Sequence, residues 1–357
     1  MKAEILRSGV VSDATENVFG YAAWPSVCLL PDGELLAAYS GNRLAHICPF
    51  GKVLLRRSAD EGRTWSAPVI AVDTPLDDRD AGLTLLPDGR LLVTTFNNTR
   101  AMQRDWAERP VVSEKARALI NAYCDLVTDA QEEKYFGSLA AFSEDGGRSF
   151  GEPFRVPVSA PHGPSVHKGR LVYAGTLAPD RPRCPDFPIE VWESADGRDW
   201  SLLAKIPPCE AYRPHGHYEP HILSLGDRLL LTVREDGDGV FTVSSAYSDD
   251  DGKTWTPLLP TGAVGSPPHL LRLASGRIVM TYGRRWKPFG IEAIVSDDNG
   301  ESWSAPVTLW TDAPTPDLGY PSSVELADGS IFTLYYGQPD AGAPCKILYT
   351  VWNMKND

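Results

Sequence analysis

Short apolar runs recur along the chain, and each begins directly after a turn that contains glycine. Six of these segments align with one another: DGELLAAYS (from Asp32), DGRLLVTTF (Asp88), KGRLVYAGT (Lys168), GDRLLLTVR (Gly226), SGRIVMTYG (Ser275) and DGSIFTLYY (Asp328). Runs of this length with little polar interruption are typical of strands buried on both faces. A second apolar segment precedes the turns, as in PSVCLLP and PSSVELA. The pattern therefore predicts six pairs of adjacent strands.

A second motif, here called the Asp turn, alternates with these strand pairs. It reads Ser, any residue, Asp, any residue, Gly, any residue, Thr or Ser, and then an aromatic residue. Its five copies are RSADEGRTWSAP (from Arg57), FSEDGGRSFGEP (Phe142), ESADGRDWSLL (Glu193, one residue shorter), YSDDDGKTWTPL (Tyr247) and VSDDNGESWSAP (Val295). Asp and Ser bond nearby backbone N–H groups, Gly adopts positive φ, and the aromatic residue packs beneath the turn. With one strand on each side of every Asp turn, the repeats predict an all-β, six-bladed β-propeller of four-stranded sheets.

The two ends of the chain are expected to meet in the last blade. The sequence ends at CKILYTVWN with no room for a fourth strand, so the N-terminal AEILRSG is expected to supply that strand and close the ring. Residues 1–357 are thus expected to form a single domain. A helical insertion, at about residues 101–136, interrupts the second blade between its second and third strands. Whether the insertion is packing decoration or a wall of the binding funnel stays open at this point.

Composition narrows the class of protein. A hydrophobic content of 42% and a charged content of 23% are those of a globular chain, and the net charge of -13 disfavours a nucleic-acid partner. No stretch is long and apolar enough to predict a membrane span, and the N-terminal residues lack the apolar segment of a secretory signal. We therefore expect a cytoplasmic protein, although a trimmed secreted form would read the same. The six Cys show no metal-binding spacing, and nothing indicates an oligomeric state.

The chemistry is predicted on the face opposite the Asp turns. In a four-stranded blade, the Asp turns and the glycine turns share one face, so the other face carries the starts of the first strands and the ends of the second strands. Polar and aromatic residues are abundant at these positions. The first-strand starts supply Trp24, Asp80, His162, Glu219, His221, His269 and Tyr320, and the second-strand ends supply Arg43, His46, Arg234, Arg284 and Arg285. We expect the binding site there.

Five Asp turns on a six-bladed propeller resemble the sialidase (neuraminidase) superfamily, in which this turn is called the Asp box or BNR repeat, and the resemblance covers essentially the whole chain. It implies a glycosidase of carbohydrate metabolism in which three Arg bind the substrate carboxylate, a Tyr paired with a Glu is the nucleophile, and an Asp is the acid/base. The segment HYEPHILSLGDRLLLTVRE matches the family at Glu219 and Arg234, IVMTYGRRW matches at Arg284 or Arg285, and GYPSSVELADG matches at Tyr320.

Two departures from the family pattern change the expected site. Ala23, in YAAWPSV, stands where the family has its first arginine, and His46, in GNRLAHICPFG, stands where the acid/base Asp is expected. The resemblance therefore implies Tyr320, Glu219 and His46 as catalytic residues, and a His suits proton transfer near neutral pH. A nearby arginine could restore the missing positive charge. The residues expected to bind substrate are Arg234, Arg284, Arg285, Arg43, Arg79, Asp80, Arg213, His221, His162, His269 and Trp24.

Three functions fit these residues. The first is a sialidase-like exo-glycoside hydrolase acting on a terminal acidic sugar, either sialic acid or a uronic-acid-like sugar, with an acidic glycan as partner. The second is a uronate-directed polysaccharide lyase in which His46 and Tyr320 act as base and acid. The third is a carbohydrate-binding propeller without catalysis, since Asp turns by themselves indicate fold more than activity.

The segment HGHYEPH raises the question of a metal. His215, His217, Glu219 and His221 alternate, which would place four potential ligands on one side of an extended segment. Pro214 and Pro220 argue against a regular strand there, and the resemblance gives Glu219 another partner. We therefore expect no metal and no cofactor.

Overall fold

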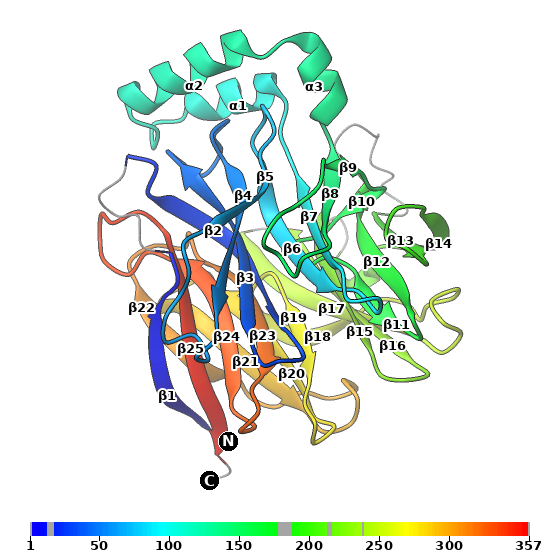
Figure 1. Cartoon of the computed structure of the whole chain (residues 1–357). Helices are drawn as coiled ribbons and strands as arrows, with labels where there is room; N and C mark the ends of the chain where they lie inside the picture. The colour runs from blue at the N-terminus through cyan, green and yellow to red at the C-terminus, as the bar shows by residue number, and fades with distance from the viewer. Residues whose placement is uncertain (1, 13–17, 178–187, 213–215, 238, 356–357) are drawn as a thin grey trace.

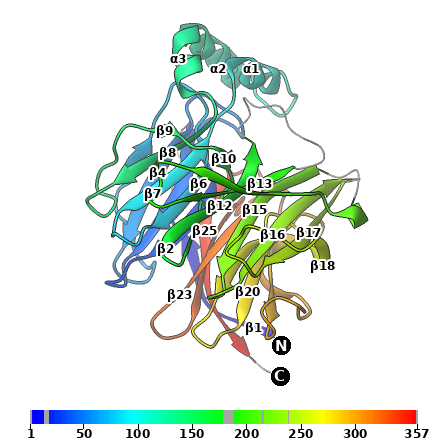
Figure 2. The same cartoon turned by 90° about the vertical axis from the view of Figure 1, so that its right-hand side faces the viewer.

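Six antiparallel sheets succeed one another along the chain, and this confirms the six-bladed β-propeller expected from the repeats (Figures 1 and 2). The computed structural model describes residues 2–12, 18–177, 188–212, 216–237 and 239–355. Five of the sheets have four strands, and the sheet of the third blade has five because its innermost strand is split in two. The apolar runs read from the sequence form the second strand of each blade.

The first three blades hold the N-terminal half of the chain. The first contains β2 (Tyr21–Leu29), β3 (Leu35–Arg43), β4 (Lys52–Ser58) and β5 (Val69–Val72). The second contains β6 (Arg79–Leu85), β7 (Leu91–Phe96), β8 (Ser138–Ser143) and β9 (Phe154–Arg155). The third contains β10 (Val158–Ser159), β11 (Ser165–His167), β12 (Arg170–Leu177), β13 (Ile189–Ser194) and β14 (Ser201–Ile206).

The last three blades complete the ring, after a short 3₁₀ helix, η1 (Glu210–Tyr212). The fourth contains β15 (Gly216–Ser224), β16 (Leu229–Gly237), β17 (Val240–Ser248) and β18 (Leu259–Val264). The fifth contains β19 (His269–Arg272), β20 (Ile278–Arg284), β21 (Phe289–Ser296) and β22 (Val307–Ala313). The sixth contains β23 (Gly319–Glu325), β24 (Ile331–Gly337), β25 (Lys346–Lys355) and β1 (Lys2–Val10). Antiparallel pairing of β1 with β25 confirms the expected closure (Figure 1).

The Asp turns make the bonds that their residue types predict. In the first copy, the Asp60 carboxylate accepts from the Thr64 backbone N–H (2.8 Å) and hydroxyl (2.6 Å), and the Ser58 hydroxyl accepts from the Gly62 N–H (2.8 Å). The Trp65 indole donates to the Gly62 carbonyl (3.1 Å), which fixes the ring under the turn. The hydrogen bonds from Thr64 lower the pKa of Asp60 to about 2. The Asp turns are therefore scaffold.

The insertion forms three helices, α1 (Arg100–Ala107), α2 (Glu114–Leu126) and α3 (Asp129–Tyr135), between β7 and β8. They lie together over one end of the propeller, away from the two termini (Figure 1). Their buried side chains pack with one another and with Leu44, which follows β3 in the first blade. None of the helices in the described residues is long and apolar enough to cross a membrane. The insertion thus covers the end of the propeller where the site was expected.

Candidate functional site

The innermost strands of four blades carry a non-glycine residue with positive φ near their start. These residues are Trp24 (52°), Asp80 (54°), Glu219 (50°) and Tyr320 (51°), and each lies at an irregularity in the pairing between the first and second strands. Such a backbone conformation costs about 1 to 3 kcal/mol per residue, and it is retained where a site requires it. A bulge re-aims a side chain out of the regular alternation of the strand. Three of the four residues precede a proline.

Tyr320 and Glu219 form the centre of the site. The Tyr320 hydroxyl donates a short hydrogen bond to one oxygen of Glu219, and Arg234 Nη1 donates to the other oxygen at 2.7 Å. Burial, together with the negative charge of Glu219, raises the pKa of Tyr320 well above its ordinary value. Tyr320 is therefore a neutral phenol at rest, with its proton already directed at a carboxylate base. The structure brings these three residues together as the sequence predicted.

A second arginine, Arg285, lies next to this centre, and it flanks the same aromatic ring as Arg234. The guanidinium carbons of Arg234 and Arg285 are 4.8 and 5.6 Å from the ring centre of Phe241, and that of Arg285 is 5.8 Å from the ring centre of Tyr320. Among the described residues, Arg285 makes only long bonds, to the carbonyls of Ser266 (3.5 Å) and Pro316 (3.4 Å). Its donors are thus the ones most available to a ligand.

Arg284 points elsewhere, although it is the sequence neighbour of Arg285. Its guanidinium pairs with Glu292 and donates to the carbonyl of Pro288, within the fifth blade. The two arginines proposed from the sequence as alternatives are thus separated by the structure. Arg284 supports the blade, and Arg285 faces Tyr320.

A third arginine approaches from the second blade. The Arg79 guanidinium stacks on the ring of Trp24 (4.0 Å to its centre), and its Nη1 and Nη2 lie 3.2 Å from the carbonyl oxygen and 3.4 Å from Nε2 of His46. Trp24 is only 1% exposed and its edge meets Tyr320, with ring centres 6.4 Å apart. Trp24 therefore packs between Arg79 and Tyr320 and offers little surface to a sugar.

Arg43 lies beneath the site, fully buried. It is paired with the buried Asp77, and it donates to Ser40 Oγ (2.8 Å) and to the carbonyl of His46 (2.8 Å). With these donors engaged and no exposed surface, Arg43 is a structural cation under the His46 loop, not a substrate contact. Arg213, the remaining arginine predicted to bind substrate, lies outside the described residues.

His46 takes part in a hydrogen-bonded chain that the sequence did not predict. Its Nδ1 is 2.9 Å from the Tyr21 hydroxyl, which donates to Asp317 Oδ2 (3.0 Å), and Asp317 also accepts from the Tyr336 hydroxyl (3.0 Å). Burial lowers the pKa of His46, partly offset by Asp317, so the ring is neutral at neutral pH. Asp317 stands three residues before Tyr320, but nothing in the sequence indicates that Asp317 or His46 contacts Tyr21.

Asp80 is the second acidic side chain near Tyr320. It is 5% exposed, its nearest basic atom is Arg79 Nε at 4.0 Å, and its Oδ1 has no hydrogen-bond partner among the described residues. Burial, opposed by Arg79 and reinforced by Glu219, raises the pKa of Asp80 to about 7. Its own charge in turn raises the pKa of Tyr320.

Three predicted histidines gather in a separate buried cluster. The ring centres of His162, His221 and His269 lie 4.6 to 5.2 Å from one another, and the three residues are 6 to 8% exposed. Burial lowers the pKa of each, to about 3 for His221. His221 Nδ1 accepts from the Leu270 N–H (2.9 Å). These rings are neutral and fill the space between neighbouring inner strands.

The alternating residues of HGHYEPH have separate partners. His217 accepts from the Cys209 N–H and lies beside Glu235, Glu219 bonds Tyr320 and Arg234, and His221 belongs to the histidine cluster. His215 lies outside the described residues. Within the part of the chain that the structure describes, no group of three or more His, Cys, Asp or Glu side chains is arranged to hold a metal ion.

The helical insertion reaches the site through Trp106 of α1. The Trp106 ring lies over His46, with ring centres 5.3 Å apart and planes inclined by 31°. Tyr123 of α2 packs on Phe50 of the same first-blade loop (4.8 Å). The insertion is therefore a wall of the site, which answers the question that the sequence left open. Its helical spacing alone did not single out Trp106.

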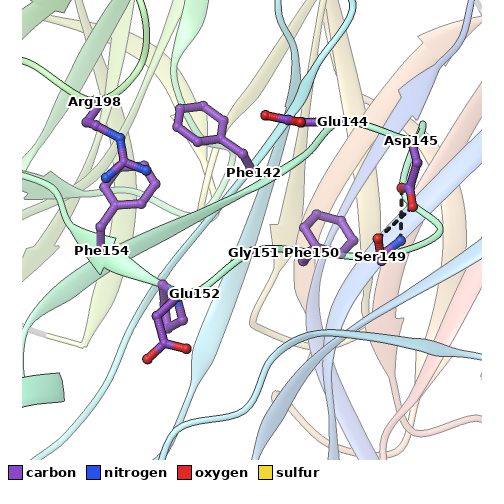
Figure 3. A pocket seen from close by; sticks show the side chains of 10 residues that line it. Phe142, Glu144, Asp145, Ser149, Phe150, Gly151, Glu152, Phe154 and Arg198 are labelled. Carbon is purple, nitrogen blue, oxygen red and sulfur yellow. Dashed lines mark hydrogen bonds between the residues drawn. The ribbon is translucent and has the colours of Figure 1, made fainter.

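A groove of about 650 Å³ opens at the second Asp turn and shares no residue with this site (Figure 3). Phe142 and Phe154 stack there at 5.1 Å, and the Arg198 guanidinium lies 4.2 Å from the ring centre of Phe154. Asp145 and Ser149 of the turn are hydrogen-bonded to each other along its edge (Figure 3). This groove thus lies between scaffold turns.

Comparisons with known proteins agree with this architecture. The family model of the BNR repeat-like domain matches residues 103–333. A sialidase from Micromonospora viridifaciens is 24% identical over 340 residues, which are 91% of this chain and 40% of the relative, so the chain spans less than half of that protein.

Two solved structures share the fold over nearly the whole chain. A protein of unknown function from Dyadobacter fermentans superposes with a TM-score of 0.76 at 23% identity, over 99% of both chains. The NanB sialidase from Streptococcus pneumoniae superposes with a TM-score of 0.68 at 13% identity, over 97% of this chain and 70% of that one. At these identities the likeness shows the fold alone.

Proposed function

Since the chain belongs to the BNR repeat-like domain family, within the sialidase superfamily, we propose that it is an exo-acting glycoside hydrolase that removes a terminal acidic sugar. The observation that carries the proposal is the hydrogen-bonded series Tyr320, Glu219 and Arg234. A phenol whose proton is directed at a carboxylate is an activated nucleophile, and the arginine holds that carboxylate in place. A platform that only bound carbohydrate would have no need for this arrangement.

The charge of the site supports an anionic substrate. Arg234 and Arg285, from the fourth and fifth blades, flank Phe241 next to Tyr320, and Arg79 of the second blade lies over Trp24, whose edge meets Tyr320. Arg285 has weak partners within the protein, and Nε of Arg234 and of Arg79 has no hydrogen-bond partner among the described residues. Guanidinium groups bind carboxylates through paired, charge-assisted hydrogen bonds. We propose that Arg79 supplies the positive charge that Ala23 removes from the first blade.

The proposed reaction has two steps. In the first, the Tyr320 oxygen bonds to the anomeric carbon while its proton passes to Glu219, and the bond from that carbon to the leaving oxygen breaks as a general acid of the site gives that oxygen a proton. In the second, water attacks the anomeric carbon and gives a proton back to the same acid group, the phenolic oxygen leaves, and Glu219 returns its proton to it. A covalent intermediate formed and broken in this way retains the anomeric configuration. A neutral phenol is a poor nucleophile, so the base is essential for the first step.

The test is hydrolysis of a panel of 4-nitrophenyl and methyl glycosides of sialic acid and of glucuronic acid, with NMR of the first product anomer. Replacing Tyr320 with Phe removes the nucleophilic oxygen with little loss of volume, and we expect the rate to fall by several orders of magnitude. Tyr349→Phe, which removes a hydroxyl from the same core cluster away from the site, serves as the control and should retain activity. First-formed product of inverted configuration would refute the mechanism.

One observation favours elimination as a second candidate. His46 is neutral and hydrogen-bonded through Nδ1, as a base would be, so an elimination from a uronate with Tyr320 as acid uses the same residues. The two reactions give different products, because elimination leaves an unsaturated sugar that absorbs in the ultraviolet. Such a product from an oligouronate, formed without release of a saturated terminal sugar, would favour the lyase.

A further inference from the structure

We propose that Asp80, and not His46, delivers the proton to the leaving group, and that His46 instead holds Arg79 in position. This inference rests on the proposed hydrolase function and deepens it. It replaces the acid role that the family resemblance implied for His46. Three observations carry it: the hydrogen-bond directions around His46, the contacts of Arg79, and the burial of an unpartnered Asp80 oxygen.

The hydrogen-bond directions around His46 determine which ring nitrogen carries the hydrogen. Asp317 is an acceptor, because hydrogen bonds from His46, Tyr336 and Tyr21 overcome the effect of burial and hold its pKa well below the usual range. The Tyr21 hydroxyl therefore donates its one hydrogen to Asp317 (3.0 Å) and accepts from His46 Nδ1 (2.9 Å). Nδ1 carries the hydrogen, and Nε2 of the neutral ring presents a lone pair. A ring in this state has no proton at Nε2 to give to a leaving group.

That lone pair faces Arg79. Arg79 Nη2 lies 3.4 Å from Nε2, and Nη1 lies 3.2 Å from the backbone carbonyl of His46. A guanidinium has donors only, so the two groups are matched, and a protonated imidazole at the same place would be repelled. The chain from Asp317 through Tyr21 and His46 thus orients Arg79 over Trp24. His46 is a positioning residue in this arrangement.

Asp80 meets the requirements of a general acid. Its carboxyl is nearly excluded from water, stands on a strained backbone and leaves Oδ1 without a partner among the described residues. The charged groups that act on it are Arg79, Glu219, Arg43 and Asp77. Burial raises the pKa of Asp80 to about 7, with the two arginines opposing the rise and the two carboxylates reinforcing it. An acid with a pKa near the working pH is protonated often enough to donate and ionised often enough to accept afterwards.

Asp78, two residues before Asp80, is a buried carboxyl with a structural role and can be compared with Asp80. Burial raises its pKa to about 7 as well, but both of its oxygens accept hydrogen bonds from Thr74, at 2.6 Å from the backbone N–H and 2.9 Å from the hydroxyl. Both carboxyls are buried, so burial does not distinguish them. Asp80 differs from Asp78 because its Oδ1 has no partner among the described residues and because its charge interacts with those of Glu219 and Tyr320.

The proton balance of the reaction is complete with this assignment. In the first step, Asp80 gives its proton to the leaving oxygen as the glycosidic bond breaks, while Tyr320 gives its proton to Glu219 and bonds to the anomeric carbon. In the second step, the Asp80 carboxylate takes a proton from the attacking water, and Glu219 returns its proton to the departing Tyr320 oxygen. Each residue ends in its starting state.

The kinetic test compares substrates with good and poor leaving groups, as the 4-nitrophenyl and methyl glycosides of one acidic sugar. For Asp80→Asn we expect about 10²- to 10⁴-fold loss of kcat/KM with the methyl glycoside and a much smaller loss with the 4-nitrophenyl glycoside. For His46→Gln we expect KM to rise by the same factor for both substrates. Equal losses on both substrates for Asp80→Asn, or a leaving-group dependence for His46→Gln, would overturn the assignment.

A second measurement does not depend on activity. The infrared spectrum of the full chain should show protonated carboxyls just below about pH 7, with one part of the band lost in Asp80→Asn and another in the control Asp78→Asn. A spectrum unchanged by Asp80→Asn would overturn the proposal even if no tested glycoside is cleaved. Lack of cleavage by the unmodified protein, with the Asp80 band present, would count against the proposed substrate class only.

Discussion

Arg284 and Arg285 are consecutive residues with the same side chain and different surroundings. Arg284 pairs with Glu292 inside its blade, and Arg285 lies beside Tyr320 and makes long hydrogen bonds to two backbone carbonyls. Arg284 is the last residue of β20, and Arg285 is the first residue of the loop that follows, so the two side chains leave the backbone in different directions. This pair offers a matched test of the carboxylate site.

We expect Arg285→Lys to raise KM for an acidic glycoside by about tenfold or more, because one charge-assisted hydrogen bond contributes about 1.5 to 3 kcal/mol and lysine cannot bind in the paired geometry. Arg284→Lys keeps the charge opposite Glu292 and should leave KM unchanged. Steady-state kinetics of both variants on one substrate checks this. The reverse ranking of the two KM values would contradict the placement of the site.

Asp80 is expected to lower the stability of the fold at neutral and alkaline pH. Its backbone has positive φ, and its carboxyl is buried beside Glu219 without a bond to Oδ1 among the described residues. Because its folded pKa is raised above the unfolded value, the folded state binds the proton more tightly than the unfolded state does. Asp80 therefore favours folding at acidic pH, and this contribution is lost as pH rises through about 7.

We expect Asp80→Asn to increase the free energy of unfolding relative to the unmodified protein, most clearly above about pH 7, where Asp80 is ionised. Asn tolerates positive φ, so the backbone is not disturbed. The difference should shrink as pH falls toward about 4, near the unfolded pKa of Asp. Urea unfolding at a series of pH values measures it. A variant less stable than the unmodified protein at about pH 8 would count against the buried, unpaired state of the carboxyl.

The helical insertion is the element that departs from the propeller repeat. Its α1 and α2 pack against each other and onto the loop between β3 and β4, and Trp106 covers His46. This contact crosses from the second blade to the first. The element thus shapes the entrance of the site without contributing to the sheets.

Trp106→Ala should raise KM for a glycoside substrate by roughly 2- to 10-fold, since contacts of an aromatic ring are worth about 0.5 to 1.5 kcal/mol beyond the area that they bury. Met102→Ala on the same helix, an exposed position, is the control and should leave KM as it is. The measurement is KM with one substrate for both variants. An unchanged KM for Trp106→Ala would mean that the insertion is only packing.

The ring as a whole depends on one strand from the beginning of the chain. The segment β1 pairs with β25 from Lys2 opposite Lys355 to Val10 opposite Leu348, so the ends of the chain complete the sixth blade together. Without β1 the last sheet would have three strands and an open edge. Tyr320, Glu219 and Asp80 lie on inner strands, which keep their angular positions only if the ring is closed.

Deleting residues 2–10 should lower the melting temperature by at least roughly 5 °C, because each ladder hydrogen bond contributes about 1 kcal/mol and each 1 kcal/mol shifts Tm by about 2 °C in a large domain. Leu6→Thr, which changes an exposed side chain and keeps the strand, should leave Tm within about 1 °C. Differential scanning calorimetry tests both. An unchanged Tm after the deletion would contradict the role of β1 in closure.

The repeating parts of this protein could be predicted from the amino-acid sequence. Strand periodicity and turn chemistry are local properties of the chain, so the six blades, the five Asp turns and the closing strand follow from the order of the residues alone. The family resemblance added Tyr320, Glu219 and Arg234 because each stands in a segment that carries its own motif. The structure brings these three residues into contact.

The contacts between blades could be known only from the folded ring. Tyr21 and Asp317 are separated by 296 positions, and Arg79 reaches His46 across a blade boundary, so neither contact leaves a local pattern in the sequence. Protonation depends on burial and neighbouring charge, which exist only after the ring has closed. The sequence shows a His and an Asp near the site but not their protonation states. In the folded protein, burial lowers the pKa of His46, which leaves a neutral imidazole, and raises the pKa of Asp80 to about 7.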